Sequence, residues 1–167
     1  MSKSSSAPAV ALRHRNLPHL LLRARETLMA HFRPLLGEFG LTEQQWRILR
    51  EVVEQGPLEP RQLCGACSIS SPSIVGVLLR MEETGLITRK RMAHDQRRVR
   101  VSLTPKSRKL AQKLIPLIEQ RYEALEASLG LRSIQEVYDA LDALLARAPR
   151  ADDAPADRAA ARAAGRP

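Results

Sequence analysis

A dense group of cationic side chains lies in one short part of the 167-residue chain. Residues 89–113 contain ten lysines and arginines but a single acidic residue, Asp95, so this segment accounts for the formal net charge of +9. The basic residues are Arg89, Lys90, Arg91, Arg97, Arg98, Arg100, Lys106, Arg108, Lys109 and Lys113. Guanidinium and ammonium groups at this density bind phosphate oxygens. The segment therefore indicates a polyanion-binding surface, with an anionic membrane contact or a solvated basic face as alternatives.

Two cysteines, Cys64 and Cys67, have the spacing that places two thiols near each other on a helix. Such a pair can bind a metal ion or undergo oxidation. A zinc site needs further ligands, but the chain has no other cysteine and its four histidines are scattered. We expect packing in the core as the main role, with oxidation sensing and metal binding as alternatives, and we expect no bound metal or cofactor.

Motifs of catalysis do not occur in the sequence. There is no GxSxG, HExxH, P-loop or dinucleotide-binding pattern. The chain has only five aromatic residues, and none lies in the basic segment, so the stacking platform of a single-strand-binding protein is missing. We therefore expect a binding protein that is not an enzyme.

The composition is typical of a globular protein in a reducing compartment. Hydrophobic residues make up 44% of the chain, which is enough to build a core. No run of about 18 consecutive apolar residues occurs, and the N-terminus lacks the apolar stretch of a secretory signal. Two cysteines do not make a disulfide framework. We expect a cytoplasmic protein with no membrane contact.

Two helices are predicted in the first third of the chain. Apolar residues three and four apart indicate a first helix over about 17–37. Thr42, with Gln45 three residues later, forms a capping box that begins a second helix, and Gly56 ends it. Trp46 and the apolar residues after it, Val53 included, form the expected core face of this second helix.

A pair of shorter helices follows. The third is expected over 60–66. Ser70 or Ser71 caps the fourth, with Pro72 in its first turn, and Gly85 ends it. Two short helices joined by a tight turn are typical of a helix-turn-helix.

The periodicity then changes from that of helices to that of strands. The runs 86–92 and 99–103 predict a β-hairpin, with the polar stretch 93–98 as the connection. Thr104 caps a long helix over about 105–129.

The chain ends in one further helix and a tail. After Gly130, a capping box of Ser133 and Glu136 is expected to begin the last helix. Residues 1–16 and 148–167 are low in large apolar side chains, so we expect both to be disordered.

The predicted order is α-α-α-α-β-β-α-α, a mainly α fold with a small β-hairpin. A helix-turn-helix followed by a charged hairpin is a winged helix-turn-helix, in which the hairpin is the wing. The basic segment covers the wing and the start of the next helix, which favours double-stranded DNA as the partner.

The chain resembles the MarR family of transcriptional regulators over residues 17–147. The resemblance rests on the run from Gly85 to Arg89, on Asp95-x-Arg97 and on Ser102-Leu103-Thr104. Within the family, residues 41–48, together with 24–26 and 32–34 of the first helix, are similar to regulators of homoprotocatechuate (4-hydroxyphenylacetate) degradation operons.

The resemblance implies a homodimer on a pseudo-palindromic operator, with repression of an aromatic-acid catabolic operon relieved by a small phenolic or aromatic acid. Residues 17–58 and 105–147 would then form a dimerisation and effector region from both chain ends, and 59–104 the DNA-binding region. The apolar faces of the terminal helices agree with burial in a dimer.

The candidate DNA-binding residues lie on the fourth helix and the hairpin. On the helix they are Ser71, Ser73, Gly76, Val77 and Arg80, which fall on or near the face opposite Ile74, Leu78 and Met81. Serines at a helix N-terminus suit a phosphate or a base edge, and Arg80 suits guanine or phosphate. Val75 or Val77 suits a thymine methyl. The alternative is that Ser71 only caps the helix and Gly76 only eases packing.

In the wing the candidates are Arg89, Arg91, Asp95, Arg97 and Arg98. Arg97 is expected in or over the minor groove, and the other arginines on the DNA backbone. Asp95 is expected to hold the hairpin and orient a nearby arginine.

The effector is expected in a pocket between the first, second and fifth helices. The candidates are His19, Arg25, His31, Trp46 and Arg47. Arg25 and Arg47 would bind the carboxylate and Trp46 would form a wall. The alternative places Trp46 in the core and the arginines in salt bridges between helices.

Two other functions remain open at this point. One is a thiol-oxidation sensor on the same fold that uses Cys64 or Cys67. The other is an interaction module that does not bind DNA, with the basic hairpin contacting an acidic partner.

Overall fold

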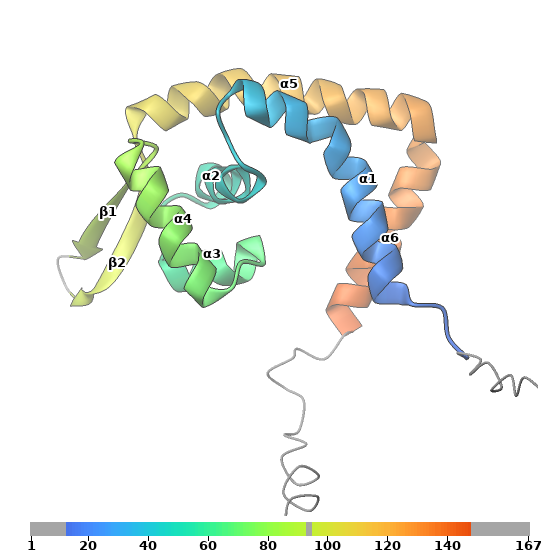
Figure 1. Ribbon diagram of the computed structural model, residues 1–167, viewed down its shortest axis with the longest axis horizontal. Helices are drawn as coiled ribbons and strands as arrows, with labels where there is room; N and C mark the ends of the chain where they lie inside the picture. The colour runs from blue at the N-terminus through green and yellow to red at the C-terminus, as the bar shows by residue number, and fades with distance from the viewer. Residues whose placement is uncertain (1–12, 93–94, 148–167) are drawn as a thin grey trace, which may run out of the picture. The chain divides into compact units, whose positions relative to one another are not determined.

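The computed structural model describes residues 13–92 and 95–147, which form six helices and one two-stranded antiparallel sheet (Figure 1). The elements are α1 (Leu17–Glu38), α2 (Glu43–Gln55), α3 (Pro60–Cys67), α4 (Ser71–Glu83), β1 (Ile87–Met92), β2 (Asp95–Leu103), α5 (Pro105–Leu129) and α6 (Leu131–Arg147). The chain divides into two compact units, Met1–Arg121 and Tyr122–Pro167. This order confirms the predicted mainly helical fold with a β-hairpin.

Side-chain caps determine where the first two helices begin. The Asn16 Oδ1 atom accepts a hydrogen bond from the His19 N–H at 3.0 Å and caps α1. At α2, the Thr42 hydroxyl accepts from the Gln45 N–H at 3.2 Å, and the Gln45 side chain accepts from the Thr42 N–H at 2.9 Å. These bonds pair amide groups that a helix leaves unpaired at its start. The capping box at Thr42 was predicted, whereas the Asn16 cap was not.

The core of the first unit is aliphatic, in keeping with the few aromatic residues. Its most deeply buried large side chains are Leu36, Ile48, Leu49, Leu63, Ile74, Leu78, Met81, Ile87, Val101 and Leu114. Trp46 joins this core at 8% exposure. Val53 was also expected on the core face of α2, but it is 40% exposed because it faces the open cavity beside α5.

The hairpin is longer than predicted. Ile87 pairs with Leu103 and the register continues to Arg91 with Val99, after which a bulge shifts the pairing so that Met92 faces Asp95. The stretch 95–98, expected in the connection, therefore belongs to β2. A bulge absorbs the unpaired residues of one strand while the two strands stay together.

A short bridge connects the hairpin to the turn before α3. Leu58 and Val101 exchange two backbone hydrogen bonds, of 3.2 and 2.7 Å. Both side chains are buried. This contact between residues distant in sequence was not predicted, and it fixes the base of the wing to the helix-turn-helix.

The predicted start of the last helix is wrong. α6 begins at Leu131, directly after Gly130, whose φ of 86° allows a sharp turn from α5 into the new helix. Ser133 therefore lies inside the first turn and is not its cap, while Glu136 pairs with Arg132 at 3.0 Å. None of the residues of α6 is buried.

Several expectations concern residues outside the described ranges. These are the N-terminal arm up to residue 12, the tail from 148, and His94. Within the described ranges, no single helix has both the length and the apolar character needed to cross a bilayer, and α3 with α4 pass that test only as a bent pair.

Candidate nucleic-acid interface

α3 and α4 form the predicted helix-turn-helix. Their axes meet at an angle of 110°, as is typical of this motif. Ser68 has a left-handed backbone, with φ of 49°, and its N–H donates to the Gly65 carbonyl at 3.2 Å. Ile69 is buried and anchors the turn in the core. The turn therefore fixes the direction in which α4 runs.

α4 has one buried and one exposed face. The buried residues are Ile74, Val77, Leu78 and Met81. The exposed residues include Ser71, Ser73, Val75, Leu79 and Arg80. The prediction that Val77 lies on the exposed face is wrong, because a spacing of three and four residues places it in the core. Val75, at 60% exposure, is the valine that can contact a base.

The first turn of α4 has no side-chain cap. Ser70 is the N-cap residue, but its hydroxyl donates to the Ser73 hydroxyl at 2.8 Å and accepts no hydrogen bond from a backbone N–H of the first turn. The Ser71 hydroxyl lies 3.8 Å from the Cys64 thiol of α3. A helix start without a side-chain cap leaves amide groups that can bind a phosphate.

Arg80 and Gly76 are close to each other on α4. The Arg80 Nη1 atom lies 3.4 Å from the position that a Cβ atom on Gly76 would occupy. Arg80 is exposed and Gly76 is half-buried.

Arg89 connects the wing to α4. Its backbone N–H donates to Glu82 Oε1 at 3.2 Å, and its Nε donates to Oε2 of the same carboxylate at 2.7 Å. The guanidinium group holds the pKa of Glu82 below its ordinary value. Arg89 therefore holds β1 against α4, and its expected contact with DNA stays a prediction.

Arg98 connects the wing to α3 in the same way. Its Nε donates to Glu59 Oε1 at 3.0 Å. Glu59 is the N-cap residue of α3, and its N–H donates to Gln62 Oε1 at 2.9 Å. The hydrogen bond from Arg98 lowers the pKa of Glu59, and the same bond raises that of Arg98.

The other cations of the hairpin are exposed. They are Lys90, Arg91, Arg97 and Arg100. Their side chains make no hydrogen bond or ion pair with another residue in the described part of the chain. Asp95 accepts a hydrogen bond from the backbone N–H of Arg97 at 3.0 Å, so it holds the Arg97 backbone in place and leaves the guanidinium group available.

The two cysteines differ in their surroundings. Cys64 is half-buried and Cys67 is buried. Burial, with a smaller contribution from the charge of Glu51, raises the pKa of the Cys67 thiol to about 11. No cluster of three metal-ligating side chains occurs among the described residues.

The candidate effector residue Arg25 belongs to a group of four charges between α1 and α2. Arg25 and Arg33 each form ion pairs with both Glu26 and Glu43. Partial burial raises the pKa of Glu43, but hydrogen bonds from the two guanidinium groups bring it below its ordinary value. Arg33 was not among the predicted residues.

The other four effector candidates do not come together with Arg25. The Arg47 guanidinium donates to the Cys67 carbonyl at the end of α3, and its Nε is buried without a partner. Trp46 is in the core, whereas His19 and His31 are exposed. Arg47 therefore connects α2 to the helix-turn-helix.

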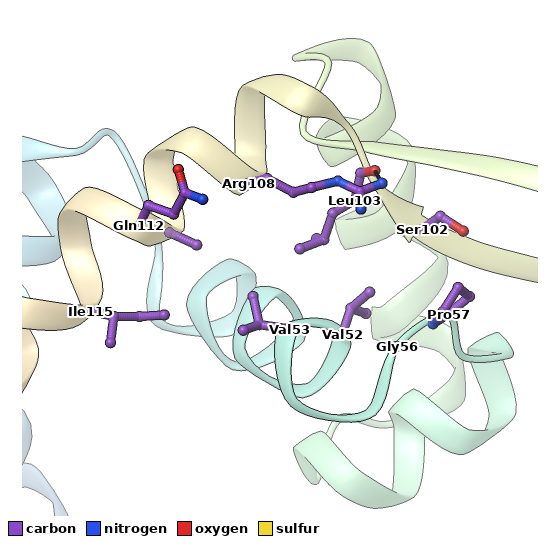
Figure 2. A pocket seen from close by; sticks show the side chains of 10 residues that line it. Val52, Val53, Gly56, Pro57, Ser102, Leu103, Arg108, Gln112 and Ile115 are labelled. Atoms are coloured by element: carbon purple, nitrogen blue, oxygen red, sulfur yellow. Dashed lines mark hydrogen bonds between the residues drawn. The ribbon is translucent and has the colours of Figure 1, made fainter.

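A cavity of about 380 Å³ lies between α2, the turn at Gly56, the end of β2 and the first half of α5 (Figure 2). Its walls are mainly apolar, with Val52, Val53, Pro57, Leu103, Ala111 and Ile115. Ser102, Arg108 and Gln112 add polar groups. Figure 2 shows the Arg108 side chain beside Leu103, to whose carbonyl its Nη2 donates at 3.0 Å. None of the five predicted effector residues lines this cavity.

Comparison with known proteins identifies the family. The MarR family sequence model matches residues 39–98, which extend from the end of α1 into β2. The HTH-type transcriptional regulator FarR of Neisseria gonorrhoeae is 37% identical over 142 residues, which are 85% of this chain and 94% of that protein. The chain belongs to the MarR family.

Further MarR-family relatives agree on the fold and the role. The homoprotocatechuate degradative operon repressor of Escherichia coli is 36% identical over 145 residues, covering 86% of this chain and 98% of that protein. The crystal structure of NadR in complex with 4-hydroxyphenylacetate has 37% identity and a TM-score of 0.72, covering 84% of this chain and 99% of that one. This MarR-family protein is a DNA-binding transcriptional repressor.

Two interface residues of this regulator were missed from sequence, the carboxylates Glu59 and Glu82. Glu59 is 39 residues from Arg98, so no local pattern connects them. Glu82 is seven residues before Arg89, with the end of a helix and a turn between them. Their proximity follows only from the fold.

Proposed function

We propose that this repressor controls an aromatic-acid catabolic operon, binds its operator as a homodimer, and leaves it when a small phenolic or aromatic carboxylate binds. The observation that carries the ligand class is the likeness to NadR, which was solved with 4-hydroxyphenylacetate. The relative from Escherichia coli, named for the homoprotocatechuate operon, supports the same class.

The DNA contacts are assigned within 59–104. Arg91 and Arg97 take phosphate or minor-groove contacts, since both are exposed and have no ion pair with a described residue. Ser71 and Ser73, at the start of α4, take a phosphate or a base edge. Arg89 and Arg98 contribute mainly by holding the wing to the helix-turn-helix.

The homodimer is assigned to the terminal helices, within 17–58 and 105–147. α6 has no buried residue, and its apolar side chains Val137 and Leu145 are 53% and 72% exposed. On α1, Leu22 is 55% exposed. Apolar surface of this kind is normally covered by a partner, and two copies of one chain can cover it symmetrically.

The cavity beside α5 offers a second place for the effector, besides the charge cluster around Arg25. Its volume of about 380 Å³ lies within the usual size of small-molecule sites. Arg108 uses one N–H group on the Leu103 carbonyl and keeps others for a carboxylate. In the charge cluster, a ligand carboxylate has to share Arg25 with Glu26 and Glu43, whose negative charges repel it.

Release of the operator tests the proposal. A fluorescent duplex, selected by the protein from a random pool, is bound and titrated with 4-hydroxyphenylacetate or with 4-hydroxyphenylacetamide. The acid is expected to release the DNA and raise the thermal midpoint of the free protein, and the uncharged amide to do neither. An acid that changes neither quantity contradicts the proposed ligand class.

Two matched variants then locate the effector. If the cavity holds the carboxylate, Arg108→Met abolishes release by the acid and retains operator binding, while Arg25→Met responds as the wild type does. The reverse result assigns the effector to the α1–α2 charge cluster.

A further inference from the structure

Gly76 occupies the centre of the exposed face of α4. Successive residues of a helix are about 100° apart, which places position 76 opposite the buried group of Ile74, Val77, Leu78 and Met81. Its φ is not positive, so the backbone there does not require glycine. Glycine inside a helix is also unfavourable relative to alanine. A side chain larger than a methyl group at this position would extend into the space above it.

That space holds the guanidinium group of Arg80. A Cβ atom on Gly76 would meet the Arg80 Nη1 atom at 3.4 Å, and no other side chain in the described part of the protein lies within 4 Å of it. Arg80 lies one turn after Gly76, and long helical side chains point back toward the N-terminus. The arginine therefore reaches back along α4 and places its charge at the centre of the exposed face.

The Arg80 guanidinium is also available for a ligand. Arg89 and Arg98 are paired with carboxylates, whereas Arg80 forms no ion pair in the described part of the chain. The exposed face of α4 also carries Val75 and Leu79, which are 60% and 45% exposed. The planar guanidinium can therefore offer two parallel N–H groups to one acceptor pair.

We propose that Gly76, because it has no bulky side chain, is a positioning residue that leaves room for Arg80 at the centre of the exposed face of α4, where Arg80 reads one guanine in each operator half-site. The O6 and N7 atoms of guanine form the acceptor pair in the major groove that a guanidinium matches. This inference rests on the DNA-binding function and adds the base that α4 reads.

The test measures the preference for each base at each position of the half-site. A variant that is merely less stable loses affinity for all duplexes alike and keeps its base preference. Competition titrations measure the affinity of each protein for duplexes that carry each of the four bases at each half-site position. The proteins are the wild type, Arg80→Met, Gly76→Leu and Gly76→Ala. The wild type is expected to prefer guanine at one position by roughly 5- to 150-fold. Arg80→Met and Gly76→Leu lose that preference at the same position, because leucine fills the space of the guanidinium.

Gly76→Ala is the matched control. Its Cβ atom would only touch Nη1 at 3.4 Å, so it keeps the guanine preference, and its thermal midpoint is unchanged or higher. Thermal midpoints and circular dichroism establish that the other variants are folded.

Three results would overturn the inference. A guanine preference that survives in Gly76→Leu shows that Gly76 does not position Arg80. Equal weakening at all bases in Arg80→Met, with a smaller salt dependence, makes Arg80 a phosphate contact. A wild type without guanine preference at any position removes the proposed contact. A wild type that binds no duplex would instead contradict the DNA-binding function itself.

Discussion

Arginines of one short segment have different roles because their neighbours differ. Arg89 and Arg98 are paired with Glu82 and Glu59, whereas Arg97 is exposed and makes no ion pair with a described residue. The sequence predicts all of them as DNA contacts, since charge is a property of the residue itself. An arginine forms an ion pair only if the folded chain brings a carboxylate close to it. The sequence alone does not show these pairs.

Replacement of Glu82 by glutamine should reduce the acid sensitivity of the protein. Arg89 lowers the pKa of Glu82 below its ordinary value of 4.5 in the folded state. A lowered folded pKa stabilises the protein above the unfolded pKa, and this stability is lost as the pH falls through the folded pKa. The thermal midpoint of the wild type should therefore fall further between about pH 5 and pH 3 than that of Glu82→Gln.

Glu83→Gln is the control for that change. Glu83 is the exposed neighbour of Glu82 and makes no ion pair among the described residues. Its variant should follow the pH curve of the wild type. Parallel curves for the wild type and Glu82→Gln would contradict the stabilising role of the Arg89 ion pair.

The two thiols should react at different rates in the native protein. With a pKa of about 11, Cys67 is almost entirely protonated at pH 8, and it is buried. Iodoacetamide followed by mass spectrometry should label Cys64 first and Cys67 only after denaturation. Equal native labelling would contradict the burial of Cys67.

The oxidation-sensing alternative is tested at the same residues. Peroxide is added to the operator complex of the wild type and of a Cys64→Ser, Cys67→Ser double variant. We expect no thiol-dependent release from the wild type. Release from the wild type that the double variant lacks would establish an oxidation sensor.

At the scale of elements, a boundary was predictable where one local sequence pattern determines it, and not where two patterns compete. No second cap pattern lies close to Thr42 and Gln45, and α2 begins where this pair predicts. Ser133 forms an equally good pattern with Glu136, but the positive φ of Gly130 lets the helix begin earlier. The inclusion of 95–98 in β2 depends on the opposite strand, where Met92 pairs with Asp95, and not on local composition. The element order was therefore predictable from sequence, and the boundaries only in part.

One threonine and one serine substitution test whether the two predicted caps stabilise their helices. Thr42→Ala removes the N-cap of α2 and should lower the free energy of unfolding by about 1 kcal/mol. Ser133→Ala removes no cap and should change it by less than about 0.5 kcal/mol. Urea denaturation of both variants gives the comparison, and equal losses would contradict the assigned start of α6.

On the scale of the whole molecule, exposed apolar side chains occur in both units, on α1 in the first and on α6 in the second. The hairpin and its cations lie in the first unit, while α6 lies in the second and exposes Val137, Leu144 and Leu145. A hairpin rich in cations and terminal helices with exposed apolar side chains suit a protein in which one region binds DNA and another pairs two chains. The sequence predicts a different division, into 17–58 with 105–147 and 59–104, and that division remains a proposal.

Charged substitutions on α6 test the dimer. Val137→Glu combined with Leu144→Glu should give a monomer in sedimentation velocity experiments, because two carboxylates cannot be buried in an apolar interface without a large cost. Helical circular dichroism should be retained. Gln135→Glu, on the opposite face of the helix, should remain dimeric; a double variant that stays dimeric would place the interface elsewhere.

The central claim is that the unpaired cations of the wing contact DNA, and the salt dependence of operator binding tests it most directly. The logarithm of the association constant is measured against the logarithm of salt concentration for the wild type, Arg97→Ala and Arg132→Ala, a control at a 93% exposed arginine side chain of α6. If each wing of a dimer contributes one phosphate contact, Arg97→Ala should weaken binding and reduce the slope by about two, while Arg132→Ala matches the wild type. An unchanged affinity and slope in Arg97→Ala would contradict the account.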